Sequence, residues 1–305
     1  MLACRGLRKQ FGERVAVDNV SFTVADNECY GLLGPNGAGK TTTIAIVCGL
    51  LKADAGEVTI DGEPGGSLGA KAAVGYVPQE LALYPDLSAR ENLHFFGQLY
   101  GLGGKRLERR ISETLALVGL AERGKDHVGT YSGGMKRRAN IAAGLLHEPR
   151  LLILDEPTVG VDPQSRNAIL ETVAGLGIAV LYTTHYMEEA AKLCHRVGII
   201  DDGRLVAEGT PANLIRDHGG SDRVRLTFGD LDSDGFAATC LRVPGVRDIR
   251  PIDGGLELTT DHGAAVLPSV VRQAGQCGVE LTGVEVLAPD LEGVFLALTG
   301  KELRD

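Results

Sequence analysis

A glycine-rich segment, Gly34-Pro-Asn-Gly-Ala-Gly-Lys-Thr41, constrains the fold more than any other part of the 305-residue chain. It matches the pattern G-x-x-x-x-G-K-[ST], in which glycines let the backbone curl so that successive N–H groups point at phosphate oxygens. A short apolar segment, Tyr30–Leu33, precedes it, and a largely apolar segment over about residues 40–51 follows it. Strand, loop and helix in this order bring the positive end of a helix to the loop. The segment therefore predicts a nucleotide-phosphate site on an α/β fold.

Two side chains at the end of this loop have the chemistry that a nucleotide and its metal require. Lys40 can reach the β- and γ-phosphates, and the Thr41 hydroxyl can bind Mg²⁺. An ordinary glycine-rich turn with an incidental lysine would not need a strand before it and a helix after it. The loop alone indicates a nucleotide and leaves the reaction open. The residues predicted to contact ATP here are Gly34, Pro35, Asn36, Gly37, Ala38, Gly39, Lys40, Thr41 and Thr42.

A second motif supplies two carboxylates at the end of an apolar strand, Leu151-Leu-Ile-Leu-Asp155-Glu156. Asp155 is placed to hold Mg²⁺ directly or through water, and Glu156 can act as general base on the attacking water. A strand that merely ends in acidic residues is common. It is the combination with the glycine-rich loop that indicates ATP hydrolysis.

A third motif, Tyr131-Ser-Gly-Gly-Met-Lys-Arg-Arg138, stands at the start of an expected helix. Ser132 has the character of a helix N-cap, and Gly133 and Gly134 leave the first-turn N–H groups accessible to an anion. Taken alone, such a sequence is an ordinary helix cap. Together with the first two motifs it indicates a further phosphate contact.

The first two thirds of the chain alternate strand-like and helical segments, which predicts a parallel sheet with helices on its faces. Strands are expected at about residues 30–33, 74–77, 151–154 and 178–183, and a hairpin at about 197–206. Between about residues 88 and 146 helical patterns prevail. There Ser88 and Glu91 fit a capping box. Apolar residues at helical spacing follow at Leu107, Ile111, Leu115 and Val118. A further helix start is indicated by Asp162-Pro163.

The pattern is interrupted at about residues 217–221, where His218-Gly-Gly predicts a boundary. Beyond it the sequence predicts strand, helix, hairpin, helix and strand, the βαββαβ order of ferredoxin-like domains. A last helix is expected over about residues 291–298. We therefore expect an ATPase domain over residues 1–218, with a helical subdomain at about 88–146, and an accessory or regulatory domain over 219–305.

The bulk properties are those of a water-soluble protein. A net charge of −9 argues against a main role in coating nucleic acid, whose phosphates demand a basic surface. The six cysteines show no metal-site spacing and are expected to be free thiols in a reducing compartment. The N-terminus has no secretory signal pattern, and no apolar run approaches the length of a membrane span. Any membrane role is therefore expected to come through a partner.

These motifs and their order resemble the ATP-binding cassette (ABC) ATPases over roughly residues 2–216. Further pieces of the resemblance are Gln79 in Val77-Pro-Gln-Glu80, the segment Val159-Gly-Val-Asp162 and His185 in Thr183-Thr-His185. Each piece is short, and six in the correct order are specific. The resemblance implies an α/β P-loop NTPase fold: a RecA-like core with an antiparallel β subdomain and a helical insertion, followed by the small α+β domain.

The resemblance also implies roles for individual residues. Two cassettes would dimerise head to tail, with each ATP between the phosphate loop of one copy and Ser132, Gly133 and Gly134 of the other. His185 would contact the γ-phosphate, and Gln79 would sense Mg²⁺ and γ-phosphate. Phe11 is similar to the aromatic residue that stacks on adenine, although an aromatic at this place could instead belong to the core. Met135 and Val159–Val161 depart from the commoner family residues, but no charged catalytic group is missing.

Two segments resemble the ATPases that pair with ABC-2 type permeases of the exporter branch: residues 83–93 and 288–300. We therefore expect an ATPase at the cytoplasmic face of the cell membrane, bound to a separate permease. The alternative is a soluble ABC-type ATPase of DNA repair or translation. Such a protein usually has a second phosphate loop, a long coiled coil or zinc-binding cysteines, and the sequence has none of these.

Overall fold

The computed structural model describes residues 1–218, 222–229 and 233–300. Contacts within the chain define two compact units, an N-terminal unit over Met1–Pro211 and a C-terminal unit that begins at Ala212. This division falls slightly before the predicted boundary at residue 218. Residues 219–221, on which that boundary partly depended, lie outside the described residues.

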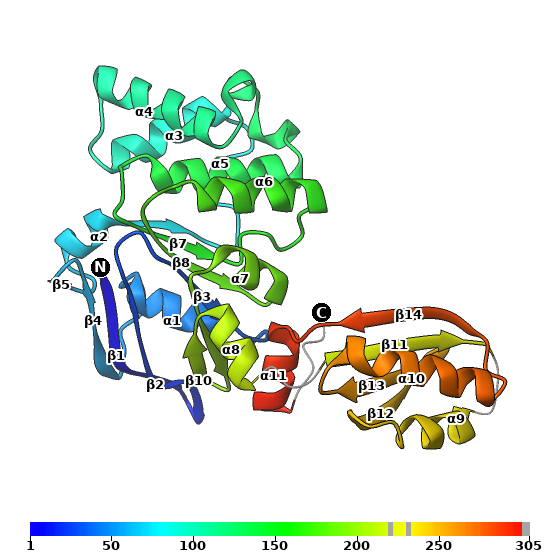
Figure 1. Cartoon of the computed structure of the whole chain (residues 1–305). Helices are drawn as coiled ribbons and strands as arrows, with labels where there is room; N and C mark the ends of the chain where they lie inside the picture. The colour runs from blue at the N-terminus through cyan, green and yellow to red at the C-terminus, as the bar shows by residue number, and fades with distance from the viewer. Residues whose placement is uncertain (219–221, 230–232, 301–305) are drawn as a thin grey trace. The chain divides into compact units, whose positions relative to one another are not determined.

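A six-stranded sheet forms the centre of the N-terminal unit (Figure 1). Its neighbouring strands pair in parallel, except for the antiparallel edge strand β10. In spatial order the strands are β10 (Arg204–Gly209), β9 (Arg196–Asp201), β3 (Cys29–Leu33), β8 (Ala179–Thr184), β7 (Leu151–Asp155) and β6 (Val74–Val77). Because parallel strands end at the same edge of a sheet, the segments after β3, β6, β7 and β8 meet there. These segments carry most of the predicted catalytic residues.

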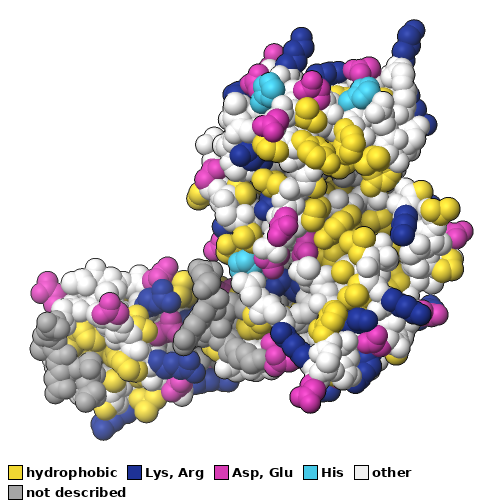
Figure 2. Space-filling view, turned by 180° about the vertical axis from the view of Figure 1, so that it is seen from behind, with side chains coloured by type: hydrophobic (Ala, Val, Ile, Leu, Met, Phe, Trp, Pro, Cys, Tyr) yellow, Lys and Arg dark blue, Asp and Glu magenta, His cyan; other side chains and the backbone are white. Residues whose placement is uncertain are grey.

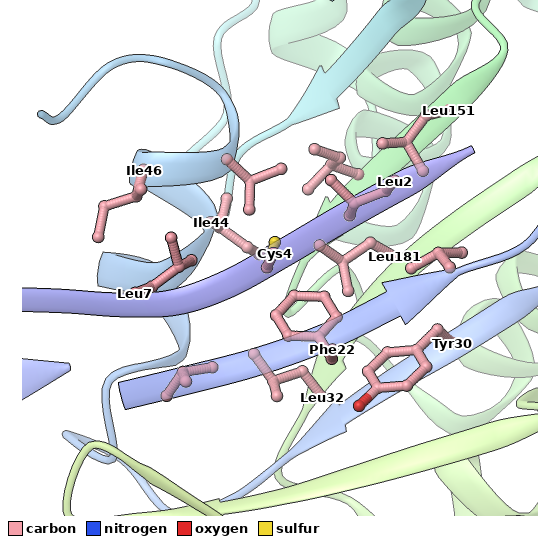
Figure 3. Packing of buried hydrophobic residues seen from close by; sticks show 14 of the residues in the cluster. Leu2, Cys4, Leu7, Phe22, Tyr30, Leu32, Ile44, Ile46, Leu151 and Leu181 are labelled. Carbon is pink, nitrogen blue, oxygen red and sulfur yellow. The ribbon is translucent and has the colours of Figure 1, made fainter. Parts of the chain in front are cut away.

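A second, antiparallel sheet belongs to the same unit. Its strands, in spatial order, are β2 (Arg14–Val24), β1 (Leu2–Phe11), β4 (Ala55–Ile60) and β5 (Glu63–Pro64). Helix α1 (Lys40–Val47) follows the glycine-rich loop and contacts β1, β2 and β7. Figure 3 shows Ile44 and Ile46 of α1 in one cluster with side chains of β1 and of the central sheet. The core therefore holds α1, and with it the loop, in place.

The predicted helical insertion is present as α3 (Ala89–Leu99), α4 (Gly104–Leu117) and α5 (Gly133–Leu145), which lie beside the sheet (Figure 1). Two short 3₁₀ turns, Ala121–Arg123 and Val128–Thr130, connect α4 to α5. The Ser88–Glu91 capping box has both of its hydrogen bonds. The apolar residues predicted at helical spacing, Leu107 to Val118, are buried.

Three further helices complete the N-terminal unit: α2 (Leu68–Ala73), α6 (Pro163–Ala174) and α7 (Met187–Leu193). Asp162 caps α6 by accepting a hydrogen bond from the Ser165 amide, with Pro163 in the first helical position, as the sequence predicted. In the described part of the chain, no helix is both long enough and apolar enough to cross a membrane.

The C-terminal unit has its own sheet and core. After α8 (Pro211–His218), its elements are β11 (Asp222–Phe228), α9 (Ser233–Cys240), β12 (Val246–Ile252), β13 (Gly255–Thr260), α10 (Gly263–Gln276), β14 (Leu281–Leu287) and α11 (Leu291–Thr299). The four strands form one antiparallel sheet in the order β12-β13-β11-β14. Apolar side chains of the sheet, α9 and α10 form a separate core that includes Phe228, Phe236 and Leu258. The elements follow one another in the predicted βαββαβ order.

Candidate active site

A cavity of about 620 Å³ opens at the edge where the parallel strands end. It collects residues from five separate stretches of sequence. Its lining residues are Phe11, Arg14, Ala16, Asn36, Gly37, Gly39, Lys40, Thr41, Thr42, Gln79, Glu156, Val159 and His185. The cavity thus brings together all four predicted catalytic residues and most of the phosphate loop. Of the other predicted site residues, Gly34, Pro35, Ala38, Asp155, Ser132, Gly133 and Gly134 are not among its lining residues.

The glycines of the phosphate loop have structural reasons for being glycine. Gly39 has a φ of 105° and precedes α1, and a Cβ there would lie 2.4 Å from the Ala16 carbonyl oxygen. A Cβ on Gly34 would lie 2.2 Å from the carbonyl oxygen of Ile200. No side chain caps the N-terminus of α1. The first-turn amides of α1 therefore retain their capacity to bind phosphate oxygens.

Lys40 is held inside the loop by oxygen acceptors. Its Nζ donates to the carbonyl oxygens of Gly34 (2.7 Å) and Pro35 (3.0 Å). It also lies 2.9 Å from Oε1 of Glu156, and the two side chains are only 4% and 6% exposed. The ammonium group is therefore already directed at the place where the loop and the end of β7 meet.

Asp155 and Thr41 present oxygen atoms to the same point. The Thr41 hydroxyl lies 3.4 Å from Oδ1 of Asp155, and the Thr183 hydroxyl donates to the same Oδ1 at 2.8 Å. Burial raises the pKa of the Asp155 carboxyl, while hydrogen bonds from Thr183 and Thr41 oppose the shift. A buried carboxylate beside a hydroxyl is a ligand set that suits Mg²⁺, which prefers oxygen ligands. The predicted metal residues Thr41 and Asp155 therefore fit this ion.

Glu156 occupies a strained backbone conformation. Its φ is 46°, in the left-handed region, a conformation that costs about 1–3 kcal/mol for a residue other than glycine. The Thr183 hydroxyl accepts a hydrogen bond from the Glu156 amide at 3.0 Å. This turn directs the carboxylate toward Lys40 on one side and His185 on the other. Nδ1 of His185 lies 3.3 Å from Oε2 of Glu156, although it does not form a hydrogen bond there.

Gln79 follows β6 and is exposed at the cavity. Its backbone is fixed by Arg137 of α5, whose Nη1 donates to the carbonyl oxygens of Gln79 (2.5 Å) and Pro78 (3.3 Å). Arg137 is buried, and burial lowers its pKa. The segment that contains Gln79 is thereby attached to the helix that begins at the Ser-Gly-Gly motif.

The Ser132 motif forms the predicted helix start. The Ser132 hydroxyl accepts a hydrogen bond from the Met135 amide at 3.3 Å, so it does not occupy the amides of Gly133 and Gly134. Ser132 and Gly133 are exposed. A Cβ on Gly134 would lie 2.2 Å from Oγ of Ser165, so this glycine also allows α5 to approach α6 closely. Sequence reasoning gave it only an anion-binding role.

Phe11 ends β1 at the rim of the cavity and is 51% exposed, so it does not belong to the core. Sequence reasoning missed its neighbours Arg14 and Ala16, and also Val159. Nη2 of Arg14 donates to the Gly37 carbonyl oxygen at 3.1 Å. No local motif marks Arg14 or Ala16, and the segment Val159-Gly-Val-Asp162 was quoted without a place in the cavity for Val159. They reach the cavity because β1, β2 and the segment after β7 converge on the phosphate loop.

A central parallel sheet, a phosphate loop that enters α1, and a carboxylate pair at the end of β7 define a P-loop ATPase. A model of the family described as ABC transporter matches residues 17–159. The linearmycin resistance ATP-binding protein LnrL of Bacillus subtilis is 45% identical to the chain over all of both sequences. The chain belongs to the ABC transporter family.

Further relatives and solved structures agree with this family assignment. The Nod factor export ATP-binding protein I of Bradyrhizobium diazoefficiens is 39% identical, covering 98% of the chain and 96% of the relative. The daunorubicin resistance ATP-binding protein DrrA3 of Streptomyces coeruleorubidus is 38% identical with the same coverage. A solved ATP-binding subunit of an ABC transporter is similar with a TM-score of 0.65 and 31% identity, over 72% of the chain and 93% of that structure.

A dimeric cassette solved in a post-hydrolysis state with ADP and phosphate is similar with a TM-score of 0.62 and 26% identity. It matches 69% of the chain and 98% of that structure. The chain is therefore an ATP-binding and ATP-hydrolysing subunit of an ABC transporter. The P-loop fold and the ATPase activity predicted from sequence are confirmed. The alternative, a soluble ATPase of DNA repair or translation, is not supported.

Proposed function

We propose that two copies of the chain bind two ATP molecules head to tail, and that hydrolysis drives export through a separate ABC-2 type permease. Each ATP would lie between the phosphate loop of one copy and Ser132, Gly133 and Gly134 of the other. One observation supports the proposed head-to-tail dimer. Ser132 and Gly133 are exposed and the first amides of their helix have no cap, yet this helix start is absent from the cavity that holds Lys40, Gln79, Glu156 and His185.

The reaction within each site follows from the side chains around the cavity. Phe11 offers an exposed ring for the adenine, and Lys40 offers a cation for the phosphates. Glu156 accepts a proton from water while the water oxygen bonds to the γ-phosphorus. The bond between that phosphorus and the bridging oxygen breaks at the same time and releases ADP. His185 lies beside Glu156 and is placed to orient the water and the γ-phosphate.

Mg²⁺ would be held by Thr41 and Asp155, with Gln79 at the cavity side. The three residues offer hydroxyl, carboxylate and amide oxygens, which match the preference of this ion. When bound, the ion neutralises charge on the β- and γ-phosphates. The protein residues fix its place: Thr183 orients the Asp155 carboxylate, and Arg137 holds the backbone of Gln79.

The dimer can be tested with the Glu156→Gln chain, which should bind ATP and hydrolyse it slowly. With MgATP we expect this chain to sediment as a dimer, and with MgADP as a monomer. Adding Ser132→Arg should abolish the ATP-dependent dimer, because the larger cation blocks the helix start. Ser112→Arg, on the exposed face of α4, is the matched control and should dimerise normally. A Ser132→Arg chain that still dimerises with ATP would contradict the proposal.

The permease would dock beside Gln79. The segment after Gln79 and helix α3 present exposed apolar side chains, including Leu81, Tyr84, Phe95 and Leu99. The rings of Tyr84 and Phe95 contact each other edge to face, with 5.4 Å between their centroids. Figure 2 shows hydrophobic side chains gathered on the surface of the helical insertion. Exposed apolar patches of this kind mark protein interfaces, and Gln79 connects the patch directly to the nucleotide cavity.

The names of the relatives, which concern linearmycin and daunorubicin resistance and Nod factor export, support export as the direction. The chain would then lie at the cytoplasmic face of the membrane through its permease. We expect the chain to copurify with a multi-span membrane protein. Phe95→Glu should abolish copurification and leave the ATPase activity of the isolated chain intact. Leu68→Glu, at an exposed apolar residue of α2, is the control that should copurify normally. Equal recovery with both variants would place the permease elsewhere.

A further inference from the structure

A buried carboxylate binds the hydroxyl of Thr184, the residue that precedes His185. Glu189 of α7 is 2% exposed and accepts two hydrogen bonds at the same oxygen, Oε2. The donors are the Tyr182 hydroxyl at 2.8 Å and the Thr184 hydroxyl at 2.9 Å, both from the end of β8. Burying a carboxylate is unfavourable unless partners compensate for it. None of the roles assigned above uses this residue.

The direction of each hydrogen bond in this cluster is fixed by chemistry. An ionised carboxylate can only accept, so the Thr184 hydroxyl must donate its single proton to Glu189. Its lone pairs then face the Tyr186 amide, which donates to the Thr184 oxygen at 2.9 Å. Burial, and then the charge of Glu189, raises the pKa of Tyr182, so this phenol also remains a donor. His185 lies between the two residues that this chain of hydrogen bonds connects.

The other side of the carboxylate faces α6. Nε of Arg166 lies 3.5 Å from Oε1 of Glu189. The same guanidinium lies over the Tyr186 ring, 4.4 Å from its centroid. The ring of Tyr186 in turn contacts the His185 ring, with 4.1 Å between the centroids. Helix α6 begins at Pro163, with Asp162 as its N-cap, four residues after Val159 of the cavity wall. Glu189 therefore touches two elements whose neighbouring segments both reach the cavity.

We propose that Glu189 is a positioning residue for hydrolysis. Through Thr184 and the Tyr186 amide it fixes the turn that orients His185. Through Arg166 it connects this turn to α6. The inference rests on the role of His185 in the proposed function. A carboxylate suits this task because it cannot donate, so only one arrangement of the hydroxyl protons satisfies the cluster. A misplacement of about 1 Å at a reacting group can lower turnover about 100-fold.

Glu189→Gln keeps the shape of the side chain but removes its charge. It also adds an amide that can donate hydrogen bonds, whereas the carboxylate can only accept them. We expect kcat to fall by about 10- to 100-fold while KM for ATP stays within about twofold, because the residue does not touch the nucleotide. Glu188→Gln changes the adjacent, exposed carboxylate and is the matched control, with no expected change. A Glu189→Gln chain with control-like kcat would overturn the inference.

A second test changes Thr184 and leaves the Glu189 carboxylate in place. Thr184→Val removes the hydroxyl and should lower kcat in the same way, whereas Thr184→Ser retains it and should restore turnover. The Tyr186 amide reports directly on the turn, and its hydrogen exchange should accelerate in Thr184→Val and not in Thr184→Ser. Unchanged exchange and turnover in Thr184→Val would contradict the inference, even if Glu189→Gln does not fold.

A double-mutant cycle with His185→Ala separates this inference from the proposed function. If Glu189 acts through His185, adding Glu189→Gln to His185→Ala should lower kcat by less than twofold further. A fully additive loss would mean that Glu189 acts by another route and would overturn the inference. If His185→Ala itself turns over normally, the role given to His185 under the proposed function fails instead.

Discussion

Lys40 and Glu156 form a buried ion pair in which the lysine of the phosphate loop faces the carboxylate expected to activate water. Their charged atoms are 2.9 Å apart, and Nζ of Lys40 also donates to two carbonyl oxygens of the loop. A nucleotide that binds here must draw Lys40 toward its phosphates, which leaves the Glu156 carboxylate available to a water molecule. The pair therefore links the binding of the nucleotide to the readiness of the base. It also means that removing either partner leaves a buried charge alone.

The first prediction concerns Glu156→Gln. We expect ATP hydrolysis to fall by about 10²–10⁴-fold, because the amide cannot take a proton from water. Binding of ATP should persist, since the loop and Lys40 are unchanged. Single-turnover hydrolysis and equilibrium nucleotide binding measure the two effects separately. Turnover at the wild-type rate would show that Glu156 is not the base.

The second prediction concerns Lys40→Ala. We expect loss of nucleotide binding or turnover, together with a loss of about 3 kcal/mol of unfolding free energy, because Glu156 is left as an unpaired buried carboxylate. Adding Glu156→Gln removes that charge and should recover part of the stability without restoring hydrolysis. Denaturant unfolding of the two single variants and the double variant measures this coupling. Strictly additive stability losses would mean that the ion pair has no energetic role.

The third prediction uses the raised pKa of Asp155. Because burial places the folded-state pKa above the unfolded value, the contribution of Asp155 to stability is complete at low pH. It is lost as the pH rises through the folded-state pKa. Asp155→Asn is neutral at every pH, so near neutral pH and without Mg²⁺ it should be more stable than the wild type. This advantage should vanish as the pH falls through the pKa of Asp155.

Thermal unfolding with a chelator, followed from about pH 7 to about pH 4, tests this dependence. In MgATP the same variant should lose hydrolysis, because it replaces the carboxylate that we propose binds Mg²⁺. Asp86→Asn, which makes the same replacement at an exposed carboxylate outside the cavity, is the matched control. If the wild type is at least as stable as Asp155→Asn at neutral pH, the electrostatic account of Asp155 is wrong.

The local signals in the sequence were sufficient to predict much of the site. The loop, the strand before it and the helix after it follow from glycine spacing and apolar runs, and the structure places β3 and α1 there. The carboxylate pair ends β7 because an apolar strand necessarily delivers its next residues to the sheet edge. The Ser88 capping box and the Asp162 cap formed as predicted, because both signals act within four residues.

Contacts between segments distant in sequence could not be predicted. Thr183 bonds to both Asp155 and Glu156, whereas the sequence placed it beside His185 without giving it a role of its own. Arg137 holds the Gln79 carbonyl from 58 residues away. Strands β1 and β2 were expected only from the resemblance, and their pairing contains several register shifts that blur a strict alternation. These features depend on tertiary packing, which overrides local patterns.

The last prediction concerns the division of the chain. We expect a chain that ends at Arg216 to bind ATP, because every residue that lines the cavity lies in the N-terminal unit and that unit has its own core. Affinity for ATP should stay within about threefold of the full chain, a difference below about 1 kcal/mol. Nucleotide titration of the shortened chain, with circular dichroism to verify folding, makes the measurement. The same shortened chain with Lys40→Ala is the control that should not bind. A folded shortened chain that has lost ATP binding would mean that the C-terminal unit supports the nucleotide site.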